Sequence, residues 1–141
     1  MSIDFDTFNR NLIDHFRANS GDIKEGIFKG APILLLTTKG AKSAKTYTTP
    51  LVYTRDGDRL VIIASKGGAP TNPAWFHNLV ADPHVGVELD GDKFTARASV
   101  VRDEAEYERL YGNHSKDNPG FIEYRKKTAR RIPIVVLERV A

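Results

Sequence analysis

The chain has 141 residues, a formal net charge of +3 and no cysteine. Without cysteine it has no disulfide, no thiolate metal site and no cysteine nucleophile, and its interleaved basic and acidic residues argue against a nucleic-acid partner. The length indicates a single domain over residues 1–141 that buries roughly two thirds of its unfolded surface.

The first predicted element is an amphipathic helix over about residues 4–18. Its apolar side chains Phe5, Phe8, Leu12 and Phe16 recur at helical spacing. We expect this face to pack on the core or to cover the domain as a lid. Membrane contact is the less favoured alternative, because a helix at a membrane surface usually carries a more uniformly cationic polar face.

A run of short strands and hairpins follows. Asp56-Gly57 and Asp90-Gly91 are hairpin signals, and Pro50 predicts an edge strand or a bulge, because proline cannot donate to a central ladder. Six or so short strands with few helices predict a mainly β (α+β) fold built on an antiparallel barrel. The predicted strands cover residues 33–38, 47–55, 59–64, 84–89, 93–101 and 132–138, and the predicted short helices cover residues 73–81, 103–111 and 120–127.

The most informative segment follows the strand that ends at Ala64. It reads Ser-Lys-Gly-Gly-Ala-Pro over residues 65–70 and enters a helix at Asn72-Pro73. The glycines let the backbone approach a ligand, and the lysine adds a point charge. Asn72 is the predicted N-cap and Pro73 suits the first turn of the helix. The unpaired amides at such a helix start favour an anion. With Trp75 as a flat face, the segment predicts a site for a phosphate-bearing, ring-containing cofactor. A plain surface loop before a capped helix is the alternative.

Other catalytic patterns are missing from the sequence. The four histidines show no metal-ligand spacing, so we expect no metal, and His77 is expected to cap or pack its helix. No local sequence suggests a Ser-His-Asp arrangement. Lys39, Lys42 and Lys45 lie in an acid-free stretch that would attract a small anionic ligand, although such residues more often form a solvated loop. An enzyme of this kind would take its chemistry from a cofactor.

These segments also carry a family resemblance. The chain is similar to the actinobacterial deazaflavin-dependent nitroreductase family, small split-barrel oxidoreductases that use reduced coenzyme F420. The similarity covers about Gly30 to Leu137 and rests on the strings LLLTTKG, TPL, ASKGGAP with PAWFHNL, and TARRIPIVVL, at residues 34–40, 49–51, 64–79 and 128–137. It implies an FMN-binding-like split β-barrel that transfers a hydride from reduced F420 to a quinone, an enone or a nitroaromatic compound.

The resemblance also implies a set of site residues. It assigns the substrate side to Ser65 and Tyr124, as candidate catalytic residues. The segment from Ala64 to Gly68 would hold the ring and the phosphate with backbone amides. The full set of implied cofactor-binding residues is Lys42, Ser43, Thr49, Pro50, Leu51, Ala64, Ser65, Lys66, Gly67, Gly68, Pro73, Ala74, Trp75 and Asn78.

Two departures from the family pattern stand out. Ala41 and Tyr47 occupy positions where the family often has arginine. Each charged hydrogen bond to phosphate that is lost in this way weakens the binding free energy of the cofactor by about 1.5–3 kcal/mol. Nitro-activating members have several tyrosines around positions 118, 121 and 124, of which this chain keeps Tyr124. FMN in place of F420, a non-catalytic cofactor carrier and a structural interaction protein are therefore kept as alternatives.

The sequence leaves a monomer and a homodimer open. No apolar stretch approaches the roughly 20 residues that span a bilayer, and the N-terminus lacks the pattern of a secretion signal. We expect a cytoplasmic protein that acts on a small-molecule acceptor, with peripheral membrane association left open.

Overall fold

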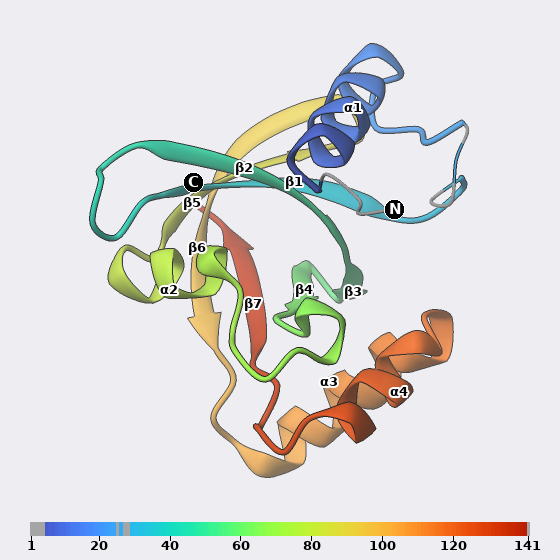
Figure 1. Cartoon of the computed structure of the whole chain (residues 1–141), viewed down its shortest axis with the longest axis vertical. Helices are drawn as coiled ribbons and strands as arrows, with labels where there is room; N and C mark the ends of the chain where they lie inside the picture. Colours follow the sequence, from blue (N-terminus) through green and yellow to red (C-terminus); the bar gives the residue numbers. More distant parts are fainter. Residues whose placement is uncertain (1–4, 25, 27–28, 141) are drawn as a thin grey trace.

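The computed structural model describes residues 5–24, 26 and 29–140, so the predicted start of the N-terminal helix at Asp4 lies outside the described residues. Figure 1 shows a strongly curved sheet with α1 above it and with α3 and α4 below. The described helices are α1 (Phe5–Ala18), the short 3-10 helix η1 (Lys66–Gly68), α2 (Ala74–Ala81), α3 (Glu104–Asp117) and α4 (Gly120–Lys127). The strands are β1 (Ile33–Lys39), β2 (Thr46–Val52), β3 (Thr54–Asp56), β4 (Arg59–Ile63), β5 (His84–Leu89), β6 (Asp92–Val100) and β7 (Ile134–Arg139).

The strands form one antiparallel, 7-stranded sheet in the order β2-β1-β5-β6-β7-β4-β3. The two edge strands, β2 and β3, are consecutive in the sequence and are separated by Tyr53 alone. One continuous segment therefore runs from one edge of the sheet to the other, and the sheet has to curl to allow it. The result is the predicted split β-barrel, with helices on its outside (Figure 1).

The prediction of one strand over residues 47–55 is wrong at Tyr53, where β2 ends and β3 has not yet begun. The Tyr53 N–H donates to the Pro32 carbonyl (3.1 Å), and the Tyr53 side chain is buried. Tyr53 therefore lies between the β1–β2 pairing, which ends at Val52, and the β3–β4 pairing, which begins at Thr54. The sheet therefore has one strand more than predicted. Pro50 lies opposite Leu35 on β2, and its predicted position on an edge strand is confirmed.

Both predicted hairpins form. β3 and β4 are joined through Gly57 and Asp58, and β5 and β6 are joined through Asp90 and Gly91. Asp90 and Gly91 have φ values of 52° and 78°. Two successive left-handed residues give the turn that matches the twist of the strands, and an Asp-Gly pair adopts it readily.

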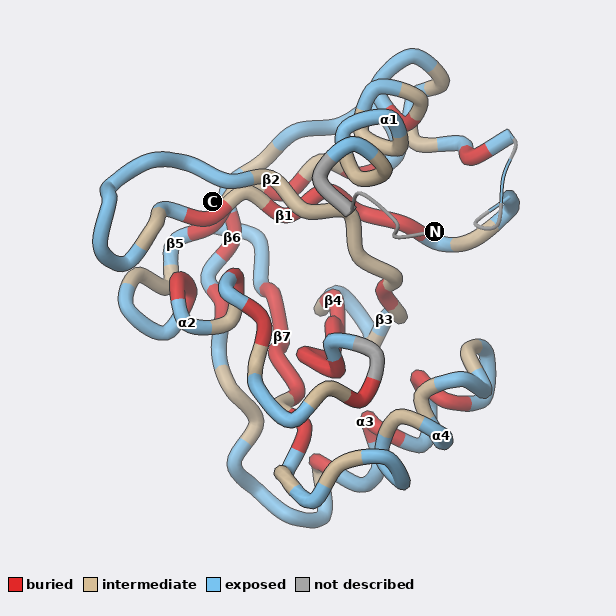
Figure 2. Tube along the Cα trace, in the orientation of Figure 1, coloured by how far each residue is buried: buried red, intermediate tan, exposed pale blue. Residues whose placement is uncertain are grey.

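Strand alternation sorts the apolar side chains between the barrel interior and its outer faces. Figure 2 shows the resulting buried stretches along β4 and β7. On β1, Leu34 and Leu36 belong to the interior cluster, whereas Ile33 and Leu35 pack with Phe16 of α1. On β4, alternate residues divide in the same way between the interior and the face that α3 covers. The curled sheet thus holds one core inside and needs α1 and α3 to bury its outer apolar faces.

A buried histidine lies where α3 and α4 cover the barrel. α3 runs to Asp117, beyond its predicted end, because its last turns bury His114 and Ser115. The His114 Nδ1 atom lies 3.0 Å from the Thr54 Oγ1 atom, and the ring meets Phe121 edge-on at a centroid distance of 4.4 Å. Burial lowers the pKa of the His114 imidazole to about 4, because desolvation disfavours the charged form.

The free energy of unfolding should therefore rise with pH across the range in which this histidine titrates. The unfolded chain binds a proton at His114 below an ordinary pKa of about 6.5, whereas the folded chain does so only near a pKa of about 4. Stability is then full above pH ~6.5 and falls by up to about 3 kcal/mol toward pH ~4. Denaturant unfolding at several pH values measures this slope.

The matched variants separate His114 from the other titrating groups. His114→Gln should remove its share of the slope, whereas Asn113→Gln, at an exposed neighbour on the same helix that has no titrating group, should keep the wild-type slope. Equal slopes in the two variants would contradict the assignment to His114.

Candidate functional site

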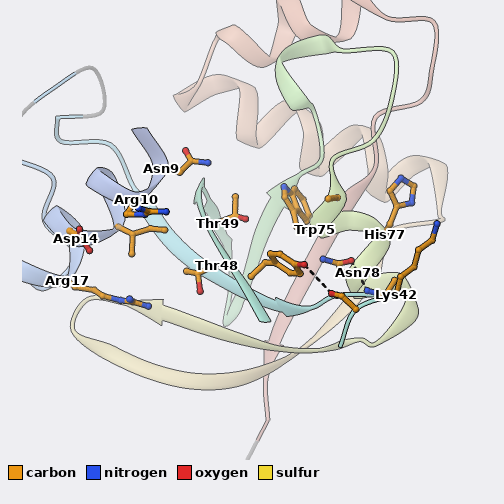
Figure 3. Close-up of a pocket in the computed structure, with 16 residues that line it drawn as sticks. Asn9, Arg10, Asp14, Arg17, Lys42, Thr48, Thr49, Trp75, His77 and Asn78 are labelled. Carbon is orange, nitrogen blue, oxygen red and sulfur yellow. Dashed lines mark hydrogen bonds between the residues drawn. The ribbon is translucent and has the colours of Figure 1, made fainter. Parts of the chain in front are cut away.

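A cleft of about 1170 Å³ lies between α1, the β1–β2 loop, the start of β2 and α2 (Figure 3). Pockets for small molecules usually measure roughly 300–1,000 Å³, so this cleft has room for a long ligand. Its lining combines charged, hydroxyl, amide and aromatic side chains. The residues that line it are Asn9, Arg10, Ile13, Asp14, Arg17, Gly40, Ala41, Lys42, Ser43, Tyr47, Thr48, Thr49, Ala74, Trp75, His77 and Asn78.

Part of the predicted cofactor-binding set lines this cleft, namely Lys42, Ser43, Thr49, Ala74, Trp75 and Asn78. Trp75 is only 7% exposed, so it forms a wall anchored in the barrel interior and not an open platform. The other predicted site residues lie outside the lining: Pro50, Leu51, Ala64, Ser65, Lys66, Gly67, Gly68, Pro73 and Tyr124.

Asn78 holds the β1–β2 loop against α2. The Asn78 Oδ1 atom accepts a hydrogen bond from the Ala41 N–H (3.1 Å), and its Nδ2 atom donates to the Thr38 Oγ1 atom (3.2 Å). Gly40 allows the tight turn, since a Cβ atom there would lie 2.5 Å from the Ser43 Oγ atom. Both ends of the Asn78 amide are used inside the protein, so this side chain positions the loop.

Replacing Asn78 by alanine should loosen this loop. The change removes the donor to the buried Thr38 hydroxyl, which lowers the unfolding free energy by about 1–3 kcal/mol, and it frees the Ala41 N–H on the exposed loop. We expect a lower unfolding free energy and faster hydrogen exchange at the Ala41 amide. Val80→Ala, on the exposed face of the same helix, is the matched control. Unchanged exchange at Ala41 in the Asn78 variant would show that this contact does not hold the loop.

Arg130 organises the segment between β4 and α2. Its guanidinium donates to the carbonyls of Ser65 (2.8 Å) and Ala69 (2.8 Å) and to the Asn72 Oδ1 atom (2.7 Å). The predicted role of Asn72 as helix N-cap is wrong for this reason, because its side chain binds Arg130 and Pro73 takes the cap position without a side-chain hydrogen bond. Sequence patterns gave no role to Arg130, and its place in the TARRIPIVVL string was the only signal.

The two predicted catalytic residues lie beside this segment. Gly68 has a φ of 83° and packs against α4, where an added Cβ atom would lie 3.0 Å from the Lys127 Cβ atom. Ser65 is buried at the start of η1, and Tyr124 is half-buried on α4. The structure thus brings Ser65 and Tyr124 onto adjacent elements. The amides of Ala64 and Gly68 donate within the protein, at 2.9 Å in each case, so phosphate contacts from this segment would come from its other groups.

Arg130→Met should destabilise the segment from residue 64 to residue 72, because several carbonyls lose a charged donor at once. We expect a lower melting temperature and faster proteolysis within this segment. Arg130→Lys should recover little, since an ammonium cannot reproduce the planar fork of donors. The control is Arg131→Met, at an exposed neighbour that pairs with Glu104 at the surface. Full recovery in the lysine variant would show that charge alone is sufficient.

α1 brings positive charge to the cleft. Figure 3 shows Arg10 and Arg17 at one end of the cleft and Lys42 at the other. Arg17 makes a bidentate ion pair with Glu88 at 3.0 and 2.8 Å, and this pairing lowers the pKa of the Glu88 carboxyl. His77 also lines the cleft and is exposed, and its ring meets Phe76 of the same helix edge-on at a centroid distance of 5.9 Å, as the expectation that it packs on the helix requires. The apolar spacing of α1 predicted its packing face but not that its polar face borders a site.

Among residues 5–24, 26 and 29–140, no three His, Cys, Asp or Glu side chains gather as a metal site would require. None of the helices in the same ranges has the length and apolar character needed to cross a bilayer.

The fold and the cleft define a split-barrel protein suited to an anionic, ring-containing ligand. A putative pyridoxamine 5'-phosphate oxidase of Listeria innocua shares the fold, with 17% sequence identity, a TM-score of 0.56 and coverage of 79% of this chain and 86% of that chain. Residues 8–139 match the family model for F420H(2)-dependent quinone reductase. The chain therefore belongs to the F420H(2)-dependent quinone reductase family.

Individual relatives agree with this assignment. An F420H(2)-dependent quinone reductase of Mycobacterium tuberculosis is 40% identical over 126 residues, which cover 88% of this chain and 85% of the relative. The solved structure of an F420-H2 dependent reductase (FDR-A) is 35% identical, with a TM-score of 0.69 and coverage of 76% of this chain and 94% of that chain. A solved domain-swapped dimer is 30% identical, with a TM-score of 0.72 and coverage of 92% and 96%.

The family assignment confirms the predicted deazaflavin-dependent oxidoreductase class and the first-choice cofactor, reduced coenzyme F420. The split-barrel prediction is confirmed by the fold and by its structural neighbours. The roles of the individual site residues stay predictions.

Proposed function

We propose that the protein binds reduced coenzyme F420 in the cleft and uses it to reduce a quinone to the quinol. The M. tuberculosis relative, at 40% identity, is itself an F420H(2)-dependent quinone reductase. The observation that carries the proposal is an overlap between two independent sets, the residues that line the cleft and the residues that the family resemblance implies. Their common members are Lys42, Ser43, Thr49, Ala74, Trp75 and Asn78.

The cleft residues fit the parts of this cofactor. Lys42 and Ser43 lie on the exposed β1–β2 loop, where an ammonium and a hydroxyl would hold the phosphate. Asn78 fixes that loop, so the two side chains start from a defined backbone. Trp75 and Thr49 would border the ring, and the burial of Trp75 keeps its indole from swinging away. The size of the cleft leaves room for the acidic tail beyond the phosphate.

When bound, reduced F420 supplies a hydride, and a quinone that takes up this hydride and one proton becomes a quinol. The contribution of the chain is to hold the acceptor in contact with the donor and to limit water. Ser65 and Tyr124, on adjacent elements, would serve the acceptor side. The Tyr124 hydroxyl would hydrogen-bond an acceptor oxygen or pass on the proton, and the Ser65 hydroxyl would orient the acceptor.

The residues at the family's tyrosine positions lead us to place quinones ahead of nitroaromatic compounds. The Asn118 Nδ2 atom donates to the His114 carbonyl (3.1 Å). Phe121 lies edge-on to His114 and Tyr124, with centroid distances of 4.4 and 5.2 Å. Asn118 is therefore engaged in capping α3 and Phe121 in packing α4 on α3, and of the positions at which nitro-activating members have tyrosines, Tyr124 is left as the phenol. We rank quinones first as acceptors, enones second and nitroaromatics last.

The oligomeric state is a separate part of the proposal. A 30% identical relative is a domain-swapped dimer, and β2 and β3 are edge strands that a second copy would be able to pair with. A homodimer is therefore the alternative to a monomer for this chain. Light scattering on the purified protein distinguishes the two.

Cofactor binding and turnover test the proposed function. Trp75 is the only tryptophan, so quenching of its fluorescence reports on the cleft. We expect F420 to bind at least about tenfold more tightly than FMN, since loss of one charged contact alone corresponds to about 1.5–3 kcal/mol. With menadione as acceptor, oxidation of reduced F420 should appear as recovery of its visible absorbance.

A pair of lysine variants makes this test specific to the cleft. Lys42→Ala should raise the dissociation constant for F420 by about tenfold or more, by loss of a charged hydrogen bond. Lys93→Ala, an equal loss of charge on β6 outside the cleft, should leave it unchanged. Tighter binding of FMN than of F420 would contradict the proposed cofactor. Tight F420 binding without turnover of any acceptor class would indicate a cofactor carrier instead of a reductase.

A further inference from the structure

One polar face of α1 is turned toward the cleft. Arg10, Ile13, Asp14 and Arg17 all line it, and their spacing puts them on one side of a helix. Figure 3 shows Arg10 and Arg17 pointing into the space beside Thr48, at the end of the cleft away from Lys42. The cleft therefore has positive side chains at both ends, on elements that are far apart in the sequence.

The two arginines of α1 are not equivalent. Arg17 donates through Nε and Nη2 to both carboxylate oxygens of Glu88, at 3.0 and 2.8 Å, so its charge is already matched. Arg10 is exposed and makes no ion pair or side-chain hydrogen bond within the described residues. The same holds for Lys42 over the described part of the chain. Arg10 and Lys42 are thus the lining cations that have a full charge to offer a ligand.

The β1–β2 loop has little positive charge of its own to offer the cleft. Lys42 is the cation by which this loop lines it, since Lys39 and Lys45 lie outside the lining. Ala41 has no charge, and its N–H is taken by Asn78 at 3.1 Å. The Tyr47 hydroxyl lies 3.1 Å from the Ser43 Oγ atom. A ligand with several negative charges needs a second cationic contact, and α1 holds one across the cleft.

We propose that Arg10 binds the acidic tail of F420 from α1 and so replaces a charged contact that Ala41 and Tyr47 cannot make. This inference rests on the proposed function, because it assumes that F420 occupies the cleft. A guanidinium meets a carboxylate or a phosphate oxygen pair with two parallel hydrogen bonds, and it remains charged at every relevant pH. The tail would then bridge from the β1–β2 loop to α1, and α1 would act as a strap over it.

The Arg10 contact itself depends on the tail of the ligand and not on its ring. The deazaflavin nucleoside, which has the same ring and sugar-alcohol chain but neither phosphate nor acidic tail, would gain nothing from Arg10. FMN has a phosphate but no acidic tail, so it would also lose the contact. The Arg10 contact therefore discriminates among ligands that present similar rings to Trp75.

The experiment measures dissociation constants by Trp75 fluorescence for two ligands, F420 and the tail-less nucleoside. The proteins are the wild type, Arg10→Met, Arg10→Lys and Arg97→Met. Arg97 is exposed on β6 outside the cleft, so its variant controls for the equal change in net charge. Arg10→Met should weaken F420 binding by about 10–100-fold, as expected for a charged hydrogen bond. Arg10→Lys should recover part of this loss, and the nucleoside should bind all four proteins equally.

A second readout follows α1 itself. Hydrogen exchange at the α1 amides should slow when F420 binds the wild type, and it should not slow with the nucleoside or in Arg10→Met. Equal weakening of both ligands by Arg10→Met would overturn the proposal, because Arg10 would then act only as part of the wall. No weakening of F420 would overturn it as well, since Arg10 would then remain in solvent. If the wild type fails to bind F420 at all, the proposed function fails first, and that outcome is seen before any variant is compared.

Discussion

The structure depends on one constraint in the chain, which is that a single segment supplies both edges of the sheet. β2 and β3 lie at opposite ends of the strand order, yet only Tyr53 separates them. A flat sheet cannot satisfy this connection, so the sheet curls until its edges approach. Curling places one set of alternating side chains in a closed interior and leaves apolar faces outside, which α1 and α3 then bury. The cleft forms where α1, α2 and the β1–β2 loop meet around this barrel.

Polar contacts between distant segments give the cleft its shape. Asn78 joins α2 to the end of β1 and to the following loop. Arg130 fixes the segment between β4 and α2 through backbone carbonyls, and Trp75 anchors the start of α2 in the interior. None of these three side chains has to perform chemistry. They hold the backbone that carries the exposed lysine, serine and threonine groups, and a cofactor enzyme requires mainly this positioning from its protein.

Local sequence predicted the parts of the fold that local rules determine. The Asp90-Gly91 turn was predicted because both residues must adopt positive φ, and the edge position of Pro50 because proline lacks an N–H. The break at Tyr53 was missed because the residues around it suit a continuous strand. The prediction of Asn72 as N-cap was wrong because the partner of its side chain, Arg130, is distant in sequence and is seen only in the folded chain. Likewise, the pattern of α1 identifies which residues pack, but only the fold shows that Arg10 faces the β1–β2 loop across the cleft.

The central claim is that the cleft between α1, α2 and the β1–β2 loop is where F420 binds. The most direct measurement is a crystal structure of the protein with F420. We expect the ring beside Trp75 and Thr49, the phosphate at Lys42 and Ser43, and the tail directed toward α1. Density for the cofactor at another place on the barrel, or this cleft filled by the protein's own side chains in the complex, would contradict it.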